Sequence, residues 1–435
     1  MRTIGLDIGT TTISAVVTED GKVIHSVTKQ NGAALKSANP ENRIQDADLI
    51  VNKVLYMKEE LVGIYAPIAA IGVTGQMHGI LYIDAKGDAV SPFYTWQDQS
   101  GELLYRDMTY SKYLADLTGH RAASGYGLVT DFVNRQLGRV PETAVMLCNI
   151  QDYVTMKLVG KKAPVTHISN AAGLGFYSLK DYDFEPDAIC KLGINRAMLP
   201  RVSAEAEVVG EDCNGIPVTV AIGDNQASFL GSAADECSVL VNIGTGSQVS
   251  VLGTETEGFA AGEIRPLARG KNLLVGAPLC GGRSFALLHR FFEETLLYFG
   301  AENPDVYSVM NAMAAEDPAD CSISVDTRFC GTRKDPTQKG AVMGITEENF
   351  TPQQLTRGFM LGMCNELYSF YEQMKELTGN THVKLIGTGN GIRKNKVLQG
   401  YLEKVFGMPL TIPENTEEAA FGTSVFAGKS IGGPR

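Results

Sequence analysis

One arrangement of residues occurs twice in this chain: a short apolar run, a turn that contains glycine and threonine, and a second run of alternating character. The first copy is "IGLDIGTTTISAVV", residues 4–17, and the second is "CSVLVNIGTGSQVSVLGTE", residues 237–255. Each apolar run has the length of a buried strand. The repeat predicts two similar halves, joined near residue 233 by the linker "GSAADE", residues 231–236. The alternative is coincidence, because strand–turn–strand units are common in mixed sheets.

The size of the chain agrees with two halves. Its 435 residues exceed the roughly 250 to 300 at which a single hydrophobic core stops growing. Hydrophobic residues make up 44% and charged residues 20%, as in ordinary folded proteins. We therefore predict an N-terminal domain over residues 1–232 and a C-terminal domain over residues 233–435.

Local patterns predict an α/β fold. The residues around Asp20-Gly21 have the signal of a two-residue hairpin, so three antiparallel strands should begin the chain. Residues 40–62 show helical spacing of apolar residues, and "IAAIGVTGQMHG", residues 68–79, returns to a strand with a glycine-framed loop. In the second half, "VKLIGTGNGIRKN", residues 383–395, supplies another strand that runs into a glycine turn. Strands and helices in this order build an α/β layer.

Charge and cysteine content limit the partners and the compartment. The formal net charge is −11 and no basic run is present, which argues against nucleic acid as a partner. A small phosphate ligand stays compatible, because backbone amides can hold one. The eight cysteines form no C-x-x-C pair, and the chain shows neither an apolar secretory leader nor a membrane span. These features predict reduced thiols and a cytoplasmic protein.

Asp7 interrupts the first apolar run, and a buried unpaired carboxylate is unfavourable by several kcal/mol. A turn of Gly9, Thr10, Thr11 and Thr12 follows it directly. Glycine amides and threonine hydroxyls can bind phosphate, and an aspartate beside them can hold Mg²⁺ directly or through water. The turn at Gly244, Thr245 and Gly246 has the same composition. The alternatives are ordinary hairpin turns, and an Asp7 that hydrogen-bonds its own turn.

Two familiar nucleotide motifs do not fit these loops. A P-loop ending at Gly428-Lys429-Ser430 would need glycine at position 423, where the chain has threonine. The dinucleotide fingerprint fits residues 387–392 only with Ile392 in place of the third small residue. An NAD-dependent polyol dehydrogenase is therefore a weakly supported alternative.

Polar residues near two glycine loops suggest an acceptor site. In "VAIGDNQASFLGSAA", residues 220–234, Asp224 follows a strand and could be either a helix N-cap or a general base. His78 lies between two glycines, and Trp96, the sole tryptophan, stands two residues before Asp98. Amide, imidazole and carboxylate groups beside one aromatic face suit a polyol. The alternative is a structural histidine and a core tryptophan.

Together these motifs resemble a known family. "IGLDIGTTT", "GQMHG", "WQD", "GDNQAS", "NIGTGSQV", "FCGTRKDPTQKGAVMG" and "GTGNGIRKN" are similar to motifs of the FGGY carbohydrate kinases and occur in family order from residue 4 to about residue 428. The resemblance implies two ribonuclease-H-like domains of the actin/hexokinase superfamily with an interdomain cleft. It also implies a sugar-binding N-terminal domain and a nucleotide-binding C-terminal domain.

The resemblance assigns roles to individual positions. Asp224 matches the catalytic base, and Asp7 matches the aspartate of the metal site. The implied substrate-binding residues are Gln76, Met77, His78, Trp96, Asp98, Asp224 and Asn225. The implied nucleotide-binding residues are Thr10, Thr11, Thr12, Gly244, Thr245, Gly246, Gly281, Gly282, Gly389, Asn390 and Asn395, and "EEAAFG", residues 417–422, closes the nucleotide domain.

The implied activity is an ATP- and Mg²⁺-dependent kinase that transfers the γ-phosphoryl group to a terminal hydroxyl of a ketose. "GQMHG" is similar to both xylulokinase-like and sedoheptulokinase-like members, whereas "WQD" and "GDNQAS" are closer to the latter. Sedoheptulose, giving sedoheptulose 7-phosphate, therefore ranks before D-xylulose and other ketoses or polyols. A non-catalytic nucleotide or sugar sensor is the alternative of another class, and a homodimer is a compatible assembly. The loop 387–395 departs from the small residues that many members have there, and the chain is short for the family.

Overall fold

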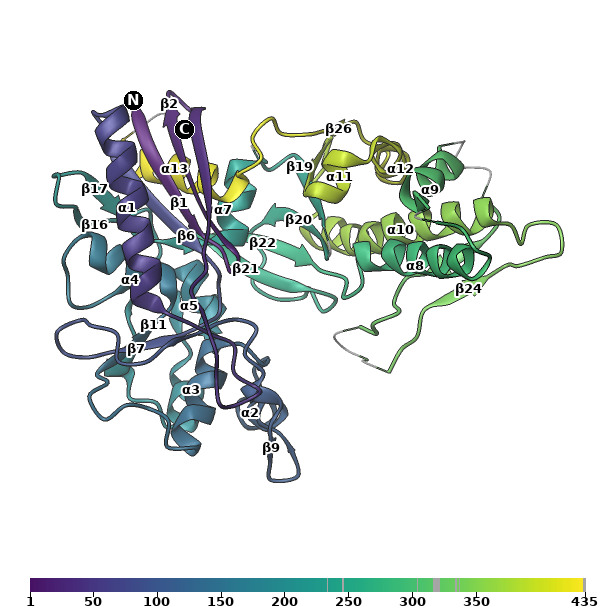
Figure 1. The fold of residues 1–435 in the computed structure, drawn as a ribbon. Coiled ribbons are helices and arrows are strands. Elements are labelled where there is room, and N and C mark those ends of the chain that lie inside the picture. The colour runs from purple at the N-terminus through teal and green to yellow at the C-terminus, as the bar shows by residue number, and fades with distance from the viewer. Residues whose placement is uncertain are drawn as a thin grey trace. The chain divides into compact units, whose positions relative to one another are not determined.

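The structure is a computed structural model that describes residues 1–232, 234–244, 246–302, 304–315, 321–332, 335 and 337–432. These described residues form two compact units. The first contains residues 1–232, 266–270 and 415–432, and the second contains residues 234–265 and 271–414. Figure 1 labels the elements of both units.

The first unit is built on a mixed sheet with the strand order β16-β17-β6-β1-β2-β3, in which β18 also pairs with β6. These strands are β1 (Arg2–Ile8), β2 (Thr12–Glu19), β3 (Lys22–Gln30), β6 (Ala70–Gly75), β16 (Val208–Glu211), β17 (Pro217–Thr219) and β18 (Ile222–Gly223). Strand β1 is antiparallel to β2 and parallel to β6. The hairpin between β2 and β3 turns at Asp20 and Gly21, both with positive φ, so the three antiparallel strands are confirmed.

The helices of the first unit are α1 (Ala47–Tyr65), α2 (Tyr110–Thr118), α3 (Gly127–Gln136), α4 (Ile150–Leu158), α5 (Ile168–Leu174), α6 (Pro186–Lys191), α7 (Asp224–Gly231) and α13 (Glu418–Ser430), with 3-10 turns at Ser100–Glu102 and Arg196–Met198. Its short strands are β4 (Ala34–Leu35), β5 (Ile44–Gln45), β7 (Leu81–Ile83), β8 (Phe93–Tyr94), β9 (Leu104–Tyr105), β10 (Met108–Thr109), β11 (Met146–Cys148), β12 (Val165–His167), β13 (Tyr177–Ser178), β14 (Asp183–Phe184) and β15 (Arg201–Ser203).

Helix α1 begins later than the predicted residue 40. Asp46 is its N-cap and accepts a hydrogen bond from the amide of Leu49, so the helix starts at Ala47. Ile44, which the helical spacing included, lies in strand β5 instead. The prediction was wrong at this end because a two-residue strand preserves an apolar spacing that also fits a helix.

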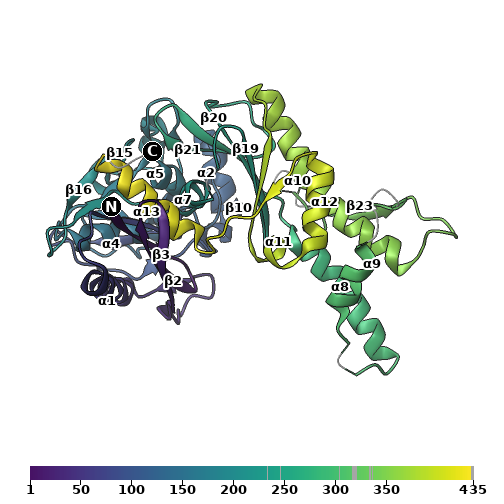
Figure 2. The same ribbon diagram turned by 90° about the horizontal axis from the view of Figure 1, so that it is seen from above.

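The C-terminal helix α13 lies in the first compact unit, whereas the predicted C-terminal domain over residues 233–435 includes it. Helix α13 packs on α7 (Figure 2), and glycines of both helices lie at the contact. A Cβ atom on Gly231 would lie 1.8 Å from the carbonyl oxygen of Glu418, and one on Gly422 would lie 1.7 Å from that of Ala227. Only glycine permits this backbone approach. The contact therefore holds the end of the chain against its first half.

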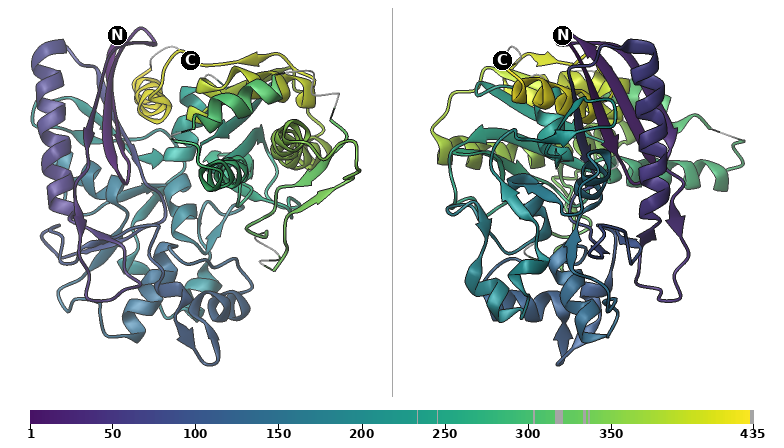
Figure 3. Two further views of the ribbon diagram at one scale, coloured as in Figure 1. Left: turned by 45° about the vertical axis from the view of Figure 1, so that its right-hand side comes forward. Right: turned by 90° about the vertical axis from the view of Figure 1, so that its left-hand side faces the viewer.

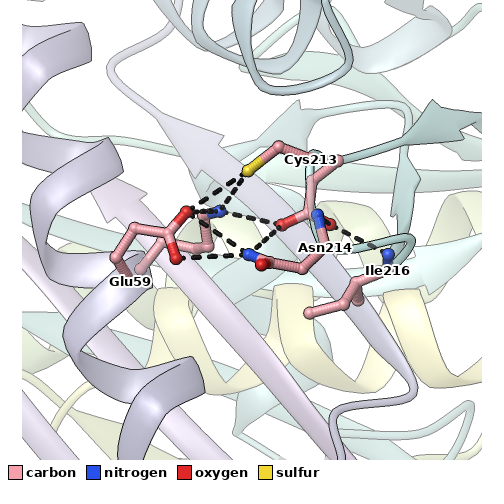
Figure 4. A network of polar contacts seen from close by, with 6 residues as sticks. Glu59, Cys213, Asn214 and Ile216 are labelled. Carbon is pink, nitrogen blue, oxygen red and sulfur yellow. Dashed lines mark hydrogen bonds and ion pairs between the residues drawn. The ribbon is translucent and has the colours of Figure 1, made fainter.

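A buried ion pair fixes α1 to the turn between β16 and β17 (Figure 4). The Lys58 ammonium lies 2.8 Å from a carboxylate oxygen of Asp212, and both side chains are almost fully buried. Asp212 also accepts hydrogen bonds from the amides of Asn214 and Ile216. Burial disfavours the charge of Lys58, but its hydrogen bonds to Asp212 and Glu59 outweigh this and raise its pKa above the ordinary value. The charged pair is thus a structural element of the first unit.

The second unit has a sheet of order β21-β22-β20-β19-β25-β26. Its strands are β19 (Ser238–Ile243), β20 (Ser247–Gly253), β21 (Glu263–Ala268), β22 (Lys271–Gly276), β25 (Lys384–Thr388) and β26 (Leu410–Thr411), with a hairpin of β23 (Ser324–Asp326) and β24 (Ala341–Met343) outside the sheet. Its helices are α8 (Gly282–Tyr298), α9 (Val306–Ala314), α10 (Pro352–Thr378), α11 (Asn390–Lys394) and α12 (Lys396–Phe406). Helices α8 and α10 lie side by side and appear nearly end-on in the left view of Figure 3.

The two sheets share one plan. Strand β19 is antiparallel to β20 and parallel to β25, just as β1 is antiparallel to β2 and parallel to β6. In each unit a glycine turn joins the two antiparallel strands. The repeat predicted from the sequence is therefore confirmed in the topology.

Candidate active site

The first unit brings Asp7 and Asp224 to one edge of its sheet. Asp7 lies near the end of β1, and Asp224 directly follows β18; both strands run parallel to β6 and pair with Thr74 and Gly75. The carboxyl ends of parallel strands meet at the same edge of a sheet, so the two aspartates come together there. The structure thus joins two residues that are 217 positions apart in the sequence.

The Asp7 carboxyl is electrostatically strained. Burial, followed by the negative charges of Asp224 and Glu417, raises its pKa from the ordinary 3.8 to about 7. Within the described ranges, no hydrogen-bond donor contacts its carboxylate, so the alternative in which Asp7 bonds its own turn is wrong. Oxygen ligands without protein donors suit Mg²⁺. A cation would relieve the repulsion among these three carboxylates.

Asp224 occupies the first position of α7. Gly223 is the N-cap, and no side chain caps this helix. Oδ1 of Asp224 instead accepts a hydrogen bond of 2.7 Å from the amide of the next residue, Asn225. The predicted alternative of Asp224 as an N-cap is therefore wrong. Oδ1 of Asn225 is buried without a hydrogen-bond partner among the described residues, which points to a ligand beside Asp224.

Asn31 forms hydrogen bonds with the backbone of the first glycine turn, Gly9–Thr12. This fully buried asparagine donates from Nδ2 to the carbonyl of Gly9 at 2.7 Å and from its amide to the carbonyl of Thr11 at 2.8 Å. The side chain of Thr11 is exposed and that of Thr12 is partly buried. The turn is therefore rigid in its backbone, with its carbonyl groups engaged on the protein side.

Gln76 and Met77 are buried and contact the residues that form the site. Gln76 donates to Gln45 and accepts from the hydroxyl of Thr10, so its amide is satisfied within the protein. Met77 lies against Gly223, where a Cβ atom would approach its sulfur to 2.7 Å. These two predicted substrate residues therefore position the turn and the strand end that carries Asp224.

His78 and Trp96 present larger surfaces. His78 has a φ of +78°, uncommon for a residue other than glycine. Its Nδ1 donates to the carbonyl of Gly173 at 2.7 Å, and its ring stacks on Tyr126 at 5.0 Å between centroids. Trp96 is 47% exposed, so it is not a core tryptophan. An exposed indole at a site edge fits the predicted apolar wall.

Asp98 is placed differently from its predicted role. It is 1% exposed, and its carboxylate accepts hydrogen bonds from Asn42 Nδ2 and from the amides of Arg43 and Ser100. These bonds tie the segment before β5 to the segment after Trp96. The structure therefore assigns Asp98 to the loop framework and not to a surface that faces a ligand.

The second glycine turn is closed by a hydrogen bond from the amide of Gly244 to the carbonyl of Gly246 at 2.8 Å. Gly244 and Gly246 flank Thr245, which lies outside the described residues. Gly281 has a φ of +48°, and a Cβ atom there would lie 2.5 Å from the amide nitrogen of Ser247. This contact brings the start of α8, at Gly282, beside the turn. In the described part of the chain the buried hydroxyl of Ser247 has no partner. A helix N-terminus next to glycine amides favours phosphate.

The predicted nucleotide-binding residues of the loop 387–395 have two different surroundings. Gly389 has a φ of +83°, and a Cβ atom on it would lie 2.5 Å from the carbonyl oxygen of Ile243, so the loop that starts α11 at Asn390 passes directly over the end of β19. Asn395 instead caps α12 by accepting from the amide of Leu398, and its Nδ2 donates to Asn311. Both groups of the Asn395 amide are therefore engaged within the second unit, and its contact with the nucleotide stays a prediction.

A cavity of about 610 Å³ in the second unit is lined in part by Gly331, Thr332, Gln338 and Met343 of the motif "FCGTRKDPTQKGAVMG". Arg328 and Glu366 are charged residues of its wall, and Leu279, two residues before Gly281, also contributes. The predicted nucleotide-binding residues that the structure describes do not line this cavity.

Sequence reasoning missed Asn31, Gln45, Glu417 and Ser247 as site residues. Glu417 lay within the quoted "EEAAFG" and Ser247 within "NIGTGSQV", so a signal was present for both. Asn31 and Gln45 belong to no motif. Their contacts with the first turn depend on the tertiary fold alone.

Two sheets of one plan, each with a glycine turn, make a mixed α/β fold of two similar units. The chain belongs to the FGGY family of carbohydrate kinases. The model of the FGGY N-terminal domain matches residues 2–231, and that of the C-terminal domain matches residues 239–431. This membership makes the protein a carbohydrate kinase and decides against the dehydrogenase alternative.

Individual relatives differ in their acceptors. Sedoheptulokinase of Mus musculus is 26% identical, with 97% of this chain and 96% of that protein aligned. Glycerol kinase of Bacillus licheniformis is 25% identical, with 99% and 90% aligned. The structure of a xylulose kinase from Lactobacillus acidophilus superposes with a TM-score of 0.83 at 20% identity, covering 99% of this chain and 89% of that one. The described helices include none long and apolar enough to span a membrane.

Proposed function

We propose that this kinase transfers the γ-phosphoryl group of ATP to a terminal hydroxyl of a ketose, with sedoheptulose first and D-xylulose second. The pairing of Asp7 and Asp224 at one sheet edge carries the proposal. The ranking of sedoheptulose is supported by the "WQD" and "GDNQAS" motifs and by the relative of that activity.

In this proposal Asp224 is the general base. Its carboxylate accepts the proton of the acceptor hydroxyl as that oxygen attacks the γ-phosphorus and the bond to the ADP oxygen breaks. Asn225, with its unpartnered buried Oδ1, accepts a hydrogen bond from a second sugar hydroxyl. The exposed indole face of Trp96 and the ring of His78 contact the carbon skeleton and the hydroxyls of the sugar.

Asp7 would hold Mg²⁺, directly or through water, since its carboxylate is near two others and has no protein donor in the described ranges. The cation would neutralise charge on the phosphates when bound. The backbone of Gly9–Thr12 would bind phosphate oxygens in the first unit. Gly244, Gly246, Gly281 and Gly282 would do so in the second, with Gly389 and Asn390 beside the nucleoside. The interdomain cleft, the cytoplasmic location and a homodimer stay predictions.

A coupled assay of ADP release tests the proposal with purified protein, MgATP and a panel of sedoheptulose, D-xylulose, D-ribulose, L-ribulose and glycerol. Sedoheptulose should give the highest kcat/KM. Asp224→Asn should lower kcat by about 10² to 10⁴, the range for loss of a general base, while ADP still binds. Nucleotide binding without turnover of any sugar would favour the sensor alternative instead.

A further inference from the structure

The hydroxyl of Thr10 is part of a closed ring of hydrogen bonds. It donates to Oε1 of Gln76 at 3.1 Å, and Nε2 of Gln76 donates to Oε1 of Gln45 at 2.8 Å. Nε2 of Gln45 then returns to the carbonyl of Thr10 at 2.9 Å. Gln45 is 4% exposed and Gln76 is 3% exposed. The ring therefore fixes both the side chain and the backbone of Thr10 from inside the protein.

In this arrangement the side chain of Thr10 cannot donate a hydrogen bond to phosphate. A hydroxyl has a single proton, and that of Thr10 goes to Oε1 of Gln76. A phosphate oxygen only accepts, so it would have to break the ring to bind this hydroxyl. The prediction that Thr10 contacts the nucleotide therefore applies to its backbone amide, while the hydroxyls of Thr11 and Thr12 face no such competition in the described structure.

The oxygen of the Thr10 hydroxyl also accepts a hydrogen bond from Trp96. The indole Nε1–H donates to Oγ1 of Thr10 at 3.0 Å. The indole has only this one donor, and it is directed at the phosphate turn while nearly half of the Trp96 surface stays exposed. One hydroxyl thus joins the aromatic residue of the acceptor site to the turn that would bind the nucleotide.

We propose that the Thr10 hydroxyl couples the acceptor site to the first phosphate turn, with Gln76 accepting its hydrogen bond and Gln45 holding Gln76 in place. This inference rests on the proposed function, because it takes Trp96 to contact the sugar and Gly9–Thr12 to contact the phosphates. A shift of the turn on nucleotide binding moves the acceptor of the indole N–H. A sugar that displaces the indole changes the same hydrogen bond and so affects the position of the turn.

Trp96 is the sole tryptophan of the chain, so its fluorescence reports this bond directly. The purified protein is titrated with MgADP and, separately, with sedoheptulose, or with the best sugar of the panel. Thr10→Val removes the hydroxyl at nearly constant volume, and Thr10→Ser retains it as the matched control. Wild type and Thr10→Ser should respond to both ligands. Thr10→Val should lose most of the MgADP response and keep the sugar response.

Trp96→Phe gives a second test that does not depend on the folding of Thr10→Val. Phenylalanine keeps an aromatic face and removes the N–H. The KM for the sugar should change by less than about threefold, and kcat/KM for ATP should fall about three- to tenfold, as for one neutral hydrogen bond. A general loss of structure would affect both substrates alike.

Two results would overturn the inference: a full MgADP response in Thr10→Val, or no response in wild type that binds MgADP by calorimetry. Equal loss for both substrates in Trp96→Phe would also count against it. Failure of the proposed function is separate, because it appears as absence of sugar-dependent ADP release by wild type. The comparison of MgADP responses in wild type and Thr10→Val then still decides whether Thr10 links the turn to Trp96.

Discussion

Replacing Asp7 with asparagine should stabilise the metal-free protein at alkaline pH. The carboxyl has a pKa of about 7 in the folded protein and about 3.8 in the unfolded chain. Between these values the unfolded chain is ionised at this position and the folded protein is protonated, so stability falls as pH rises through this window. Above pH 7 the folded protein carries the full unfavourable charge. An amide at position 7 has no such charge.

The pKa values set the size of the effect. A difference of about 3 pH units corresponds to about 4 kcal/mol at 1.36 kcal/mol per unit. The side chain retains some solvent contact, which screens part of the charge, so we expect about 2 to 4 kcal/mol. For a unit of this size, 1 kcal/mol shifts Tm by about 2 to 4 °C. Asp7→Asn should therefore raise Tm by about 5 °C or more at pH 8.

The change in Tm is measured by thermal unfolding followed by tryptophan fluorescence, since Trp96 lies in the same unit as Asp7. Wild type and Asp7→Asn are compared at pH 8, 6 and 4 without metal, and at pH 8 with MgCl₂. The advantage of the variant should shrink toward pH 4, and MgCl₂ should stabilise wild type alone. An advantage that is absent at pH 8, or equal at every pH, would refute the reasoning.

Three further sets of substitutions test contacts within the first unit. Lys58→Met should lower the free energy of unfolding, measured by urea denaturation, by about 3 to 5 kcal/mol, because it leaves the Asp212 carboxylate buried without its ion-pair partner. Adding Asp212→Asn should recover a large part of this loss. Gly422→Ala should destabilise by about 3 kcal/mol or more through its contact with α7, whereas Gly63→Ala in α1, where nothing lies within 4 Å, should stabilise by about 0.5 to 1 kcal/mol. Asp98→Asn should cost about 1 to 3 kcal/mol in stability with a sugar KM within about threefold of wild type; a large KM change with unaltered stability would restore Asp98 as a sugar ligand.

The parts of the fold that local sequence could predict are those with a strict pattern. Alternation around Asp20-Gly21 gives the β2–β3 hairpin, and apolar runs before glycine give β1, β6, β19 and β25. The assignment of α13 could not be predicted in this way. It depends on backbone contact at Gly231 and Gly422, and a glycine in a helix pattern does not reveal what approaches it.

The same limit applies to the candidate site. Motif residues that follow strand ends, such as Asp7 and Asp224, are placed by the sheet itself, so their proximity follows from the strand order. Asp98 and Asn395 stand in similar motifs but are engaged by Asn42 and Asn311, which are distant in sequence. A motif gives the residue type at a position, but the partners of its side chain are set by tertiary packing.

The repeat also shows which residue of the second sheet takes the place of Asp7. The residue of β19 that corresponds to Asp7 is Asn242: each precedes an Ile-Gly-Thr sequence, and each pairs in parallel register with a threonine, Thr74 in one sheet and Thr388 in the other. Nδ2 of Asn242 donates to the hydroxyl of Thr388 at 2.9 Å. A second carboxylate there would repel a phosphate at the neighbouring turn, whereas an amide does not. Under the proposed function Asp7 would hold a cation in the first unit, whereas Asn242, which differs from it by one side-chain atom, would leave the second turn without a negative charge.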